Sequence, residues 1–330
     1  MRAWRVQSHG EPVDVLTQME LEAPEPGPGQ VAIEVTAAGI GLPDVFMCRG
    51  SYPLTPPLSF TPGQEGVGIV TAVGDGVDVP IGTRVMTVTD FIAGHGSFAQ
   101  MSVANAQSLF PVPDGLTDAQ AAGFWIPHMT GWIGLVERGH LAEGEWLVVL
   151  GAAGGSGIAA VQLGRALGAR VIAVVSDDQR AAFCRELGAE VTINRNDGPL
   201  ARALRDATDG RGVDVVYDPV GGSVAVDSAG ALAHGGRLLL VGFASGSWPQ
   251  IEPHSLVVRN ASLVGVFAGG FVRTHLDQMH RQMSELIADG RLRNAVTATV
   301  PFDEVPQAVQ RLADNKVVGK LVVDVAAAGA

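Results

Sequence analysis

The stretch of sequence that decides the fold spans residues 146–157 and reads Trp146-Leu147-Val148-Val149-Leu150-Gly151-Ala152-Ala153-Gly154-Gly155-Ser156-Gly157. Its first five residues are continuously apolar, which is typical of a strand buried on both faces of a parallel sheet. A glycine-rich turn follows at once, and a helical pattern begins near Gly157. Glycines alone are weak evidence for a ligand, because they occur in any tight turn, including one that binds nothing. At a strand–helix junction, however, free N–H groups and the positive end of a helix dipole favour a bound pyrophosphate.

The alternation of strand and helix continues after this motif. A helix is expected over residues 157–167 and another over 200–207, and further strands over 170–175, 190–193, 213–217 and 237–241. Such an alternation predicts a doubly wound parallel sheet with a dinucleotide at its glycine-rich turn.

The chain before residue 117 has a different texture. Short strands are expected over residues 31–37, 66–74 and 83–88, and Gly and Pro residues bound them. This spacing favours a small barrel or sandwich. The tail adds predicted helices at 274–288 and 305–313 and a strand at 320–325, and we expect it to return to the first domain.

Length and composition limit the classes of function. A chain of 330 residues favours two domains. The formal net charge of -12 argues against a nucleic-acid partner, which needs a basic surface. No apolar stretch approaches the roughly 20 residues of a membrane span, so no membrane partner is predicted. Two cysteines, Cys48 and Cys184, cannot form a disulfide framework, which favours a reducing, cytoplasmic location.

The end of the second sheet strand bears on the choice of dinucleotide. An NAD-binding site places a carboxylate there to hold the ribose hydroxyls, whereas this strand ends at Val175 and Ser176. Arg180 and Arg195 follow at positions from which a guanidinium can meet a 2′-phosphate. Both arginines can instead be solvated surface charges, and Asp177 and Asp178 can cap a helix or reach the ribose. We favour NADPH.

With these motifs in place, the chain resembles the medium-chain dehydrogenase/reductase superfamily, in its zinc-independent quinone oxidoreductase branch. The resemblance covers residues 1–325 and rests on several motifs: Pro62-Gly63-Gln64-Glu65-Gly66-Val67-Gly68, the turn at 152–157, the run Gly212–Gly222, the segment Val241-Gly242-Phe243-Ala244, and Gly319-Lys320.

The resemblance implies an α/β fold in which a Rossmann doubly wound parallel sheet is joined to a GroES-like β-barrel domain. We place the first part of the GroES-like catalytic domain at residues 1–122, the Rossmann NADP-binding domain at 123–266, and a C-terminal return to the catalytic domain at 267–330. The resemblance also implies a homodimer formed through the last strand of the nucleotide sheet, at about residues 262–266.

Zinc-dependent relatives need Cys, His and a further Cys or carboxylate around the metal. At the matching positions this chain has Gly41, Gln64 and Ile126, and of the neighbouring groups only Glu65 is a carboxylate. We therefore predict no metal. Without a Lewis acid, hydride transfer needs an acceptor that is already electrophilic, such as a quinone or an α,β-unsaturated carbonyl.

Three residues are candidate catalytic groups by the resemblance. Tyr52 lies in a segment that borders the substrate cleft in the family, Gln64 occupies a vacated ligand position, and Thr130 matches a threonine near the nicotinamide. The plainer alternatives are rim packing for Tyr52, filling of the former metal space for Gln64, and helix packing for Thr130. His128 is a possible proton donor, although a buried structural histidine is the simpler interpretation.

The predicted cofactor-binding residues come from the same motifs. Phe243 and Phe267 match segments that line the nicotinamide, although both can be ordinary core residues. The full set comprises Thr130, Ala153, Gly154, Gly155, Ser156, Gly157, Ser176, Arg180, Arg195, Val220, Gly242, Phe243, Phe267 and Lys320.

The sequence thus predicts an enzyme that transfers a hydride from NADPH to a small-molecule quinone or enone, including an enoyl thioester. A zinc alcohol dehydrogenase lacks its ligands here. A third interpretation, a low-turnover NADPH-binding protein with a structural or binding role, stays open.

Overall fold

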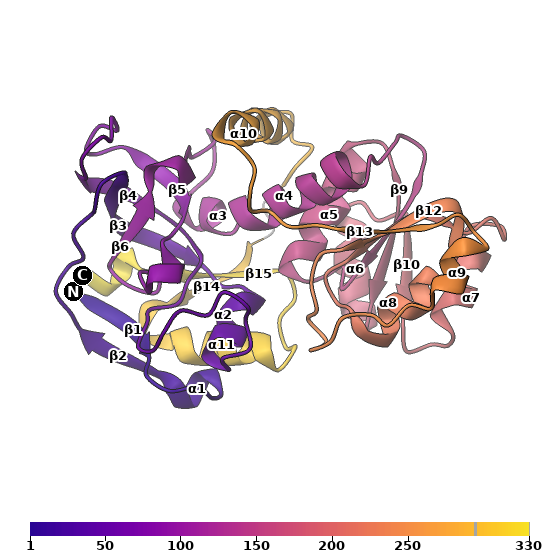
Figure 1. The fold of residues 1–330 in the computed structure, drawn as a ribbon, viewed down its shortest axis with the longest axis horizontal. Helices are drawn as coiled ribbons and strands as arrows, with labels where there is room; N and C mark the ends of the chain where they lie inside the picture. The colour runs from indigo at the N-terminus through magenta and orange to yellow at the C-terminus, as the bar shows by residue number, and fades with distance from the viewer. Residues whose placement is uncertain (294–295, 330) are drawn as a thin grey trace. The chain divides into compact units, whose positions relative to one another are not determined.

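The computed structural model describes residues 1–293 and 296–329. The chain forms two compact units, shown in Figure 1. The first contains Met1–Ile126 and the described residues of the C-terminal segment, and the second is Pro127–Arg293.

The second unit is built on one six-stranded parallel sheet. Its strand order is β10-β9-β8-β11-β12-β13. The strands are β8 (Trp146–Leu150), β9 (Arg170–Val175), β10 (Val191–Asn194), β11 (Val213–Asp218), β12 (Leu232–Leu240) and β13 (Ser262–Gly265). Strand order reverses between β8 and β11, so the carboxyl ends of these two strands form the topological switch point where such sheets bind ligands. The doubly wound sheet predicted from the sequence is confirmed.

Helices connect these strands. They are α5 (Gly155–Ala166), α6 (Asp178–Glu186), α7 (Leu200–Asp206), α8 (Gly222–Ala229), α9 (Pro253–Val257) and α10 (Arg273–Ala288). Because parallel crossovers are right-handed, α5 and α6 lie on one face of the sheet and α7 and α8 on the other. α4 (Trp125–Trp132) continues into a π-helical segment, Ile133–Arg138. Among the described residues no helix has the length and apolar character to cross a bilayer.

The first unit is mainly antiparallel. Its seven-stranded sheet has the order β14-β15-β3-β4-β5-β7, with β6 also paired to β3. The strands are β3 (Gln30–Gly39), β4 (Glu65–Val73), β5 (Arg84–Val88), β6 (Met101–Asn105), β7 (Leu109–Pro111), β14 (Val296–Pro301) and β15 (Lys320–Asp324).

Smaller elements complete the first unit. A separate two-stranded sheet joins β1 (Arg2–Val6) and β2 (Leu16–Glu20). The helices are α1 (Pro12–Val15), α2 (Leu42–Cys48), α3 (Asp118–Ala122) and α11 (Val305–Ala313). A core of buried aromatic and aliphatic side chains, including Phe60 and Phe98, unites β1, α2 and α11.

The compact units differ from the predicted domain boundaries in the C-terminal segment. We expected the return to begin at residue 267, whereas the second unit extends to Arg293. The reason is the packing of α10, whose Met279 and Met283 are buried. After this helix the Arg293 N–H donates to Gln162 Oε1 on α5 at 2.6 Å. Only the part with β14, α11 and β15 joins the first unit. The first boundary also lies a few residues later than predicted, after Ile126.

Both cysteines are free and fully buried. Burial raises the pKa of the Cys48 thiol to about 12, and it raises that of Cys184 to about 12 as well. Neither thiol is therefore ionised at neutral pH.

A buried ion pair closes the first unit. Lys320 at the start of β15 pairs with Glu65 Oε1 at the start of β4, and each side chain is only 5% exposed. Glu65 Oε2 also accepts the N–H of Ile126 at 3.0 Å. Two charges removed from water are tolerated only when they satisfy each other. The pair therefore ties the C-terminal strand to the N-terminal part of the chain.

We expect Lys320→Met to lower the free energy of unfolding by about 3–5 kcal/mol, because it leaves a buried carboxylate without its cation. Urea denaturation followed by circular dichroism measures the change. The double variant Glu65→Gln/Lys320→Met should recover most of the loss. Lys316→Met is the control, since Lys316 pairs with Asp314 at the surface and exposed pairs contribute at most about 1 kcal/mol. Equal stability of Lys320→Met and Lys316→Met would contradict this account.

Candidate functional site

In the turn after β8, the backbone of Gly151 and Ala152 lies very close to the first turn of α5. Gly151 has φ +58°, and its carbonyl accepts the Gly154 N–H at 2.9 Å. A Cβ built on Gly157 would lie 2.3 Å from the Gly151 oxygen and 2.7 Å from Ala152 Cα. Only glycine fits at position 157, which explains why this motif needs that residue.

The first turn of α5 offers donors to a ligand. The helix begins after Gly154, which has no side chain to cap it. In the described part of the chain, the N–H groups of Gly155, Ser156 and Gly157 have no acceptor. Three donors with no acceptor among the described residues, at the positive end of a helix dipole and at the switch point of the sheet, form a cradle for a pyrophosphate. Ala153 is buried within the same turn.

A second turn at the end of β11 is held by Asp218. This carboxylate is fully buried, and its Oδ1 accepts the N–H groups of Val220 at 2.9 Å and Gly221 at 2.7 Å. Oδ2 has no partner in the described structure. Burial raises the pKa of Asp218 despite these two hydrogen bonds. Val220 lies against the first turn, since a Cβ on Gly151 would be 2.9 Å from Val220 Cγ2.

The end of β9 carries the residues predicted to choose the dinucleotide. Asp177 caps α6, because its Oδ1 accepts the Arg180 N–H at 2.9 Å, and its Oδ2 pairs with the Arg180 guanidinium. The backbone hydrogen bond from Arg180 lowers the pKa of Asp177. Ser176 donates to Asp177 Oδ2 at 3.1 Å. Arg195 is exposed at the end of the neighbouring β10, and its N–H donates to the Val175 carbonyl. The capping role that the sequence left open for Asp177 is therefore observed.

The loop after β12 packs on the turn that Asp218 holds. The Ala244 N–H donates to Pro219 O at 3.1 Å, and the Ser245 N–H donates to Val220 O at 2.8 Å. Gly242 is close to Pro219 as well, since a Cβ there would be 3.0 Å from the Pro219 carbonyl oxygen. Phe243 is half-buried, with its ring centroid 5.0 Å from that of Trp248.

Phe267 and Thr130 also lie in the second unit. Phe267 is 69% exposed, which is inconsistent with an ordinary core residue. Thr130 is half-buried on α4, next to Gly131, where a Cβ would be 2.8 Å from Leu163 Cδ1. His128 on the same helix is buried.

In the first unit, Gln64 lies among buried polar groups. Its side chain is buried and its Nε2 has no hydrogen-bond partner in the described structure. Asp44 is also buried and contacts the residue before Gln64. Its Oδ1 accepts the Gly63 N–H at 2.9 Å, and its Oδ2 accepts the Gly41 N–H at 2.8 Å. The structure thus brings together Gly41 and the segment of Gln64, the two vacated ligand positions.

Tyr52 and Lys320 have separate environments in that unit. Tyr52 is half-buried and packs against the core that contains Val45 and Met47. Lys320 is committed to Glu65, and its role toward a cofactor stays a prediction. Across the described ranges, no three His, Cys, Asp or Glu side chains are grouped to hold a metal ion.

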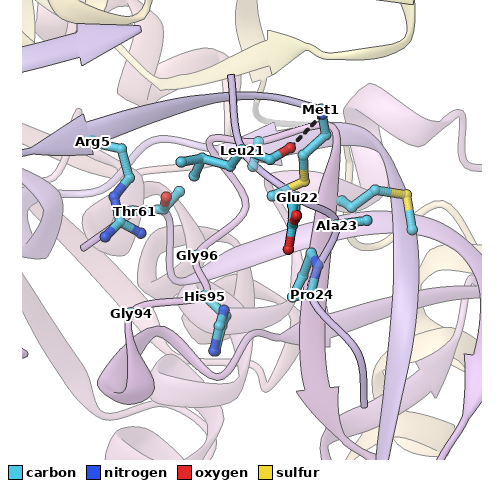
Figure 2. Close-up of a pocket in the computed structure, with 12 residues that line it drawn as sticks. Met1, Arg5, Leu21, Glu22, Ala23, Pro24, Thr61, Gly94, His95 and Gly96 are labelled. Atoms are coloured by element: carbon cyan, nitrogen blue, oxygen red, sulfur yellow. Dashed lines mark hydrogen bonds between the residues drawn. The ribbon is translucent and has the colours of Figure 1, made fainter. Parts of the chain in front are cut away.

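Figure 2 shows a cavity of about 440 Å³ in the first unit. Arg5, Glu22, Thr61 and His95 contribute its polar lining. None of the predicted site residues lines this cavity, so we do not assign the reaction to it.

Three residues that hold the candidate site were not predicted from the sequence. Tyr217 hydrogen-bonds Ser156 Oγ at 2.8 Å, Asp218 holds the second turn, and Asp44 holds the vacated ligand segment. A signal existed for Tyr217, because a tyrosine inside a buried apolar strand needs a partner for its hydroxyl. A lone aspartate in a turn or short helix gives no such signal.

One unit has two glycine-containing turns on a parallel sheet and the other is mainly antiparallel, which is the architecture of a two-domain dinucleotide-dependent dehydrogenase. Two family models match the chain: an alcohol dehydrogenase GroES-like domain at residues 27–114, and a zinc-binding dehydrogenase at residues 155–288. A quinone oxidoreductase-like protein 2 homolog from Nematostella vectensis is 33% identical, over 90% of this chain and 82% of that protein.

Solved structures agree with these matches. A probable oxidoreductase from Mycobacterium abscessus is 37% identical with a TM-score of 0.87, over 98% of each chain. A mycobacterial protein complexed with NADPH is 30% identical with a TM-score of 0.91, over 98% of this chain and 99% of that one. The chain belongs to the medium-chain dehydrogenase/reductase superfamily, in its quinone oxidoreductase-like branch. The GroES-like and Rossmann assignments are thereby confirmed, and the protein is an oxidoreductase.

The Asp44 environment predicts a pH dependence of stability. Burial is the main cause that raises the pKa of Asp44 from 3.8 to about 7, opposed by the Gly41 hydrogen bond and by the charge of Lys320. Between these two values the folded protein holds a proton that the unfolded chain has released. The contribution of Asp44 to the free energy of unfolding should therefore fall as pH rises from about 4 to about 7, and level off above.

Asp44→Asn should be less stable than the wild type, because one amide nitrogen then faces a backbone N–H. Its unfolding free energy should nevertheless vary less between pH 4 and 7, since the group no longer titrates. Thermal unfolding at several pH values measures both effects. Asp75→Asn, at an exposed turn, is the control and should keep the wild-type slope; an unchanged slope in Asp44→Asn would refute the assignment.

Proposed function

We propose that this protein is a zinc-independent, NADPH-dependent oxidoreductase that transfers a hydride to a quinone or an α,β-unsaturated carbonyl. One observation carries the proposal: an intact pyrophosphate cradle coexists with Gly41 and Gln64 at the positions where zinc-dependent relatives need ligands. A glycine offers no side-chain donor to a metal, and zinc prefers thiolate, imidazole or carboxylate. The two free, buried thiols fit a reducing compartment such as the cytoplasm.

The residues present fit NADPH. The free N–H groups of Gly155, Ser156 and Gly157 suit the pyrophosphate, and the close approach at Gly157 leaves the turn no room for another side chain. The structure of the NADPH-complexed mycobacterial relative supports the same choice. When bound, this cofactor supplies the hydride.

The 2′-phosphate would lie at the ends of β9 and β10. Asp177 is occupied by the cap of α6 and by Arg180, so it does not replace the missing ribose carboxylate. Arg195 then presents its guanidinium to a phosphate, and Arg180, which pairs with Asp177 through Nη1, adds the remaining N–H groups of its planar fork. The exposed position of Arg195 leaves its side chain available.

The acceptor is polarised by hydrogen bonding. Gln64 Nε2 is a buried donor with no partner among the described residues, and a donor of this kind stabilises negative charge that develops on a carbonyl oxygen. The Tyr52 hydroxyl supplies a second donor, and Thr130 orients the nicotinamide. A quinone or enone suits these modest donors, because its own conjugation delocalises the developing charge.

The purified protein should oxidise NADPH in the presence of 9,10-phenanthrenequinone, 1,4-benzoquinone or a short enone, and it should do so without bound zinc. Absorbance at 340 nm follows the reaction, and elemental analysis with a chelator control measures the metal. Binding of NADPH without turnover of any acceptor would favour the low-turnover binding protein instead. Stoichiometric zinc that activity requires would refute metal independence.

Arg180→Ala should weaken NADPH binding about tenfold and leave NADH binding almost unchanged, since only NADPH has the 2′-phosphate and a charged hydrogen bond contributes about 1.5 kcal/mol. Isothermal titration calorimetry measures the dissociation constants for both cofactors, and so the difference between the two losses. Arg202→Ala, an exposed arginine on α7, is the matched control. Equal losses for NADPH and NADH would contradict the 2′-phosphate role.

We also propose a homodimer formed through β13. This strand is an edge of the six-stranded sheet, and Leu263 on it and Val257 on α9 are exposed. The N–H of Val266 donates to Leu240 O on β12, so the alternating N–H of Leu263 points to the open edge. An open edge with exposed apolar side chains is suited to pairing with a second copy.

Sedimentation equilibrium should give twice the chain mass for the wild type. Leu263→Lys should shift the equilibrium toward monomer, because like charges meet across the paired strands. Ile81→Lys, at an exposed apolar position in the first unit, should stay dimeric. A monomeric wild type would remove this part of the proposal.

A further inference from the structure

Tyr217 connects the centre of the sheet to the pyrophosphate cradle. Its side chain on β11 is completely buried and packs close to Gly134, where a Cβ would be 2.9 Å from the tyrosine ring. Its hydroxyl lies 2.8 Å from Ser156 Oγ, which is at the second position of α5. Ser156 itself is only half-buried. The hydrogen bond thus joins a fixed interior group to a residue of the cradle.

The direction of this hydrogen bond follows from burial. Ser156 Oγ is the one partner of the Tyr217 hydroxyl among the described residues. Burial raises the pKa of Tyr217, so the phenol keeps its proton. If Ser156 were the donor, the phenolic proton would be buried without an acceptor, which is costly. Tyr217 is therefore the donor and Ser156 Oγ the acceptor.

This assignment leaves the Ser156 proton free. The oxygen accepts from the interior, so its own O–H does not point to Tyr217. Ser156 lies in the first turn of α5 between Gly155 and Gly157, whose N–H groups have no acceptor among the described residues. An anion in the cradle then meets a hydroxyl donor whose oxygen is already held by Tyr217. Prior orientation reduces the entropy lost on binding.

We infer that Tyr217 is a positioning residue, which holds Ser156 so that its hydroxyl donates to the pyrophosphate of the dinucleotide. The inference rests on the proposed NADPH site. Tyr217 does not touch the cofactor and acts only through Ser156.

A double-variant cycle tests the inference. The dissociation constant for NADPH is measured by calorimetry for the wild type, Ser156→Ala, Tyr217→Phe and the double variant. Ser156→Ala should weaken binding about tenfold, as expected for a hydrogen bond to a charged group. Tyr217→Phe should weaken it about threefold when Ser156 is present and not at all when position 156 is Ala.

Two further readouts separate positioning from a general structural role. Adenosine 2′-monophosphate lacks the pyrophosphate, so its affinity should be the same in all four proteins. Thermal unfolding should show a lower Tm for Ser156→Ala, whose buried phenol has lost its acceptor, and a recovered Tm in the double variant. Ser228→Ala is the control: Ser228 donates to Val224 O at 2.8 Å on α8, and its loss should not change NADPH affinity.

Failure of the proposed function and failure of this inference give different results. A wild type that does not bind NADPH overturns the proposed function. A wild type that binds it, with an equal effect of Tyr217→Phe in both backgrounds, shows that Tyr217 acts through packing and overturns the inference. Unchanged affinity in Ser156→Ala overturns it as well.

Discussion

The close contact between the first turn of α5 and the turn after β8 is the constraint on which the site depends. At Gly157 the separation from the Gly151 oxygen leaves no room for a side chain. Because the helix starts so near the strand, its free N–H groups lie at the carboxyl edge of the sheet, at the switch point. Asp218 holds a second turn, in which Val220 lies against Gly151. The loop after β12 packs on that second turn. The backbone, more than any one side chain, builds the site.

The first unit depends on a different kind of contact, which is polar and buried. Glu65 and Lys320 join strands that are far apart in the sequence, and Asp44 holds the Gly41 and Gly63 backbones with one carboxylate. A buried ion pair such as Glu65–Lys320 adds little net stability but is costly to break. These contacts hold the backbone around the two vacated ligand positions.

Much of the fold follows from local patterns in the sequence. The buried run before Gly151 and the alternation after it predicted the sheet. The strand predicted at 31–37 lies within β3, and the one predicted at 66–74 corresponds to β4, which ends one residue earlier at Val73. The boundary near residue 267 was not predictable in the same way, because α10 is amphipathic and the pattern of its sequence does not say which unit it packs on. Its place in the second unit follows only from its packing, in which Met279 and Met283 are buried, and from the contact of Arg293 with α5.

The site was predicted unevenly for a similar reason. The glycine turn is contiguous in sequence, so its residues were identified together. The partners of Ser156, Gly41 and Glu65 come from distant segments, and pairings such as Ser156 with Tyr217 depend on strand register rather than spacing. The carboxylate at Asp177 was ambiguous until its cap of α6 was seen.

The burial of the two thiols has a consequence for an enzyme of this kind. Quinones and enones are electrophiles that alkylate thiolates, and the thiolate is the reactive form of cysteine. Cys48 and Cys184 are inaccessible and remain protonated at neutral pH. With the proposed acceptors as substrates, this burial protects both cysteines from covalent modification by those substrates.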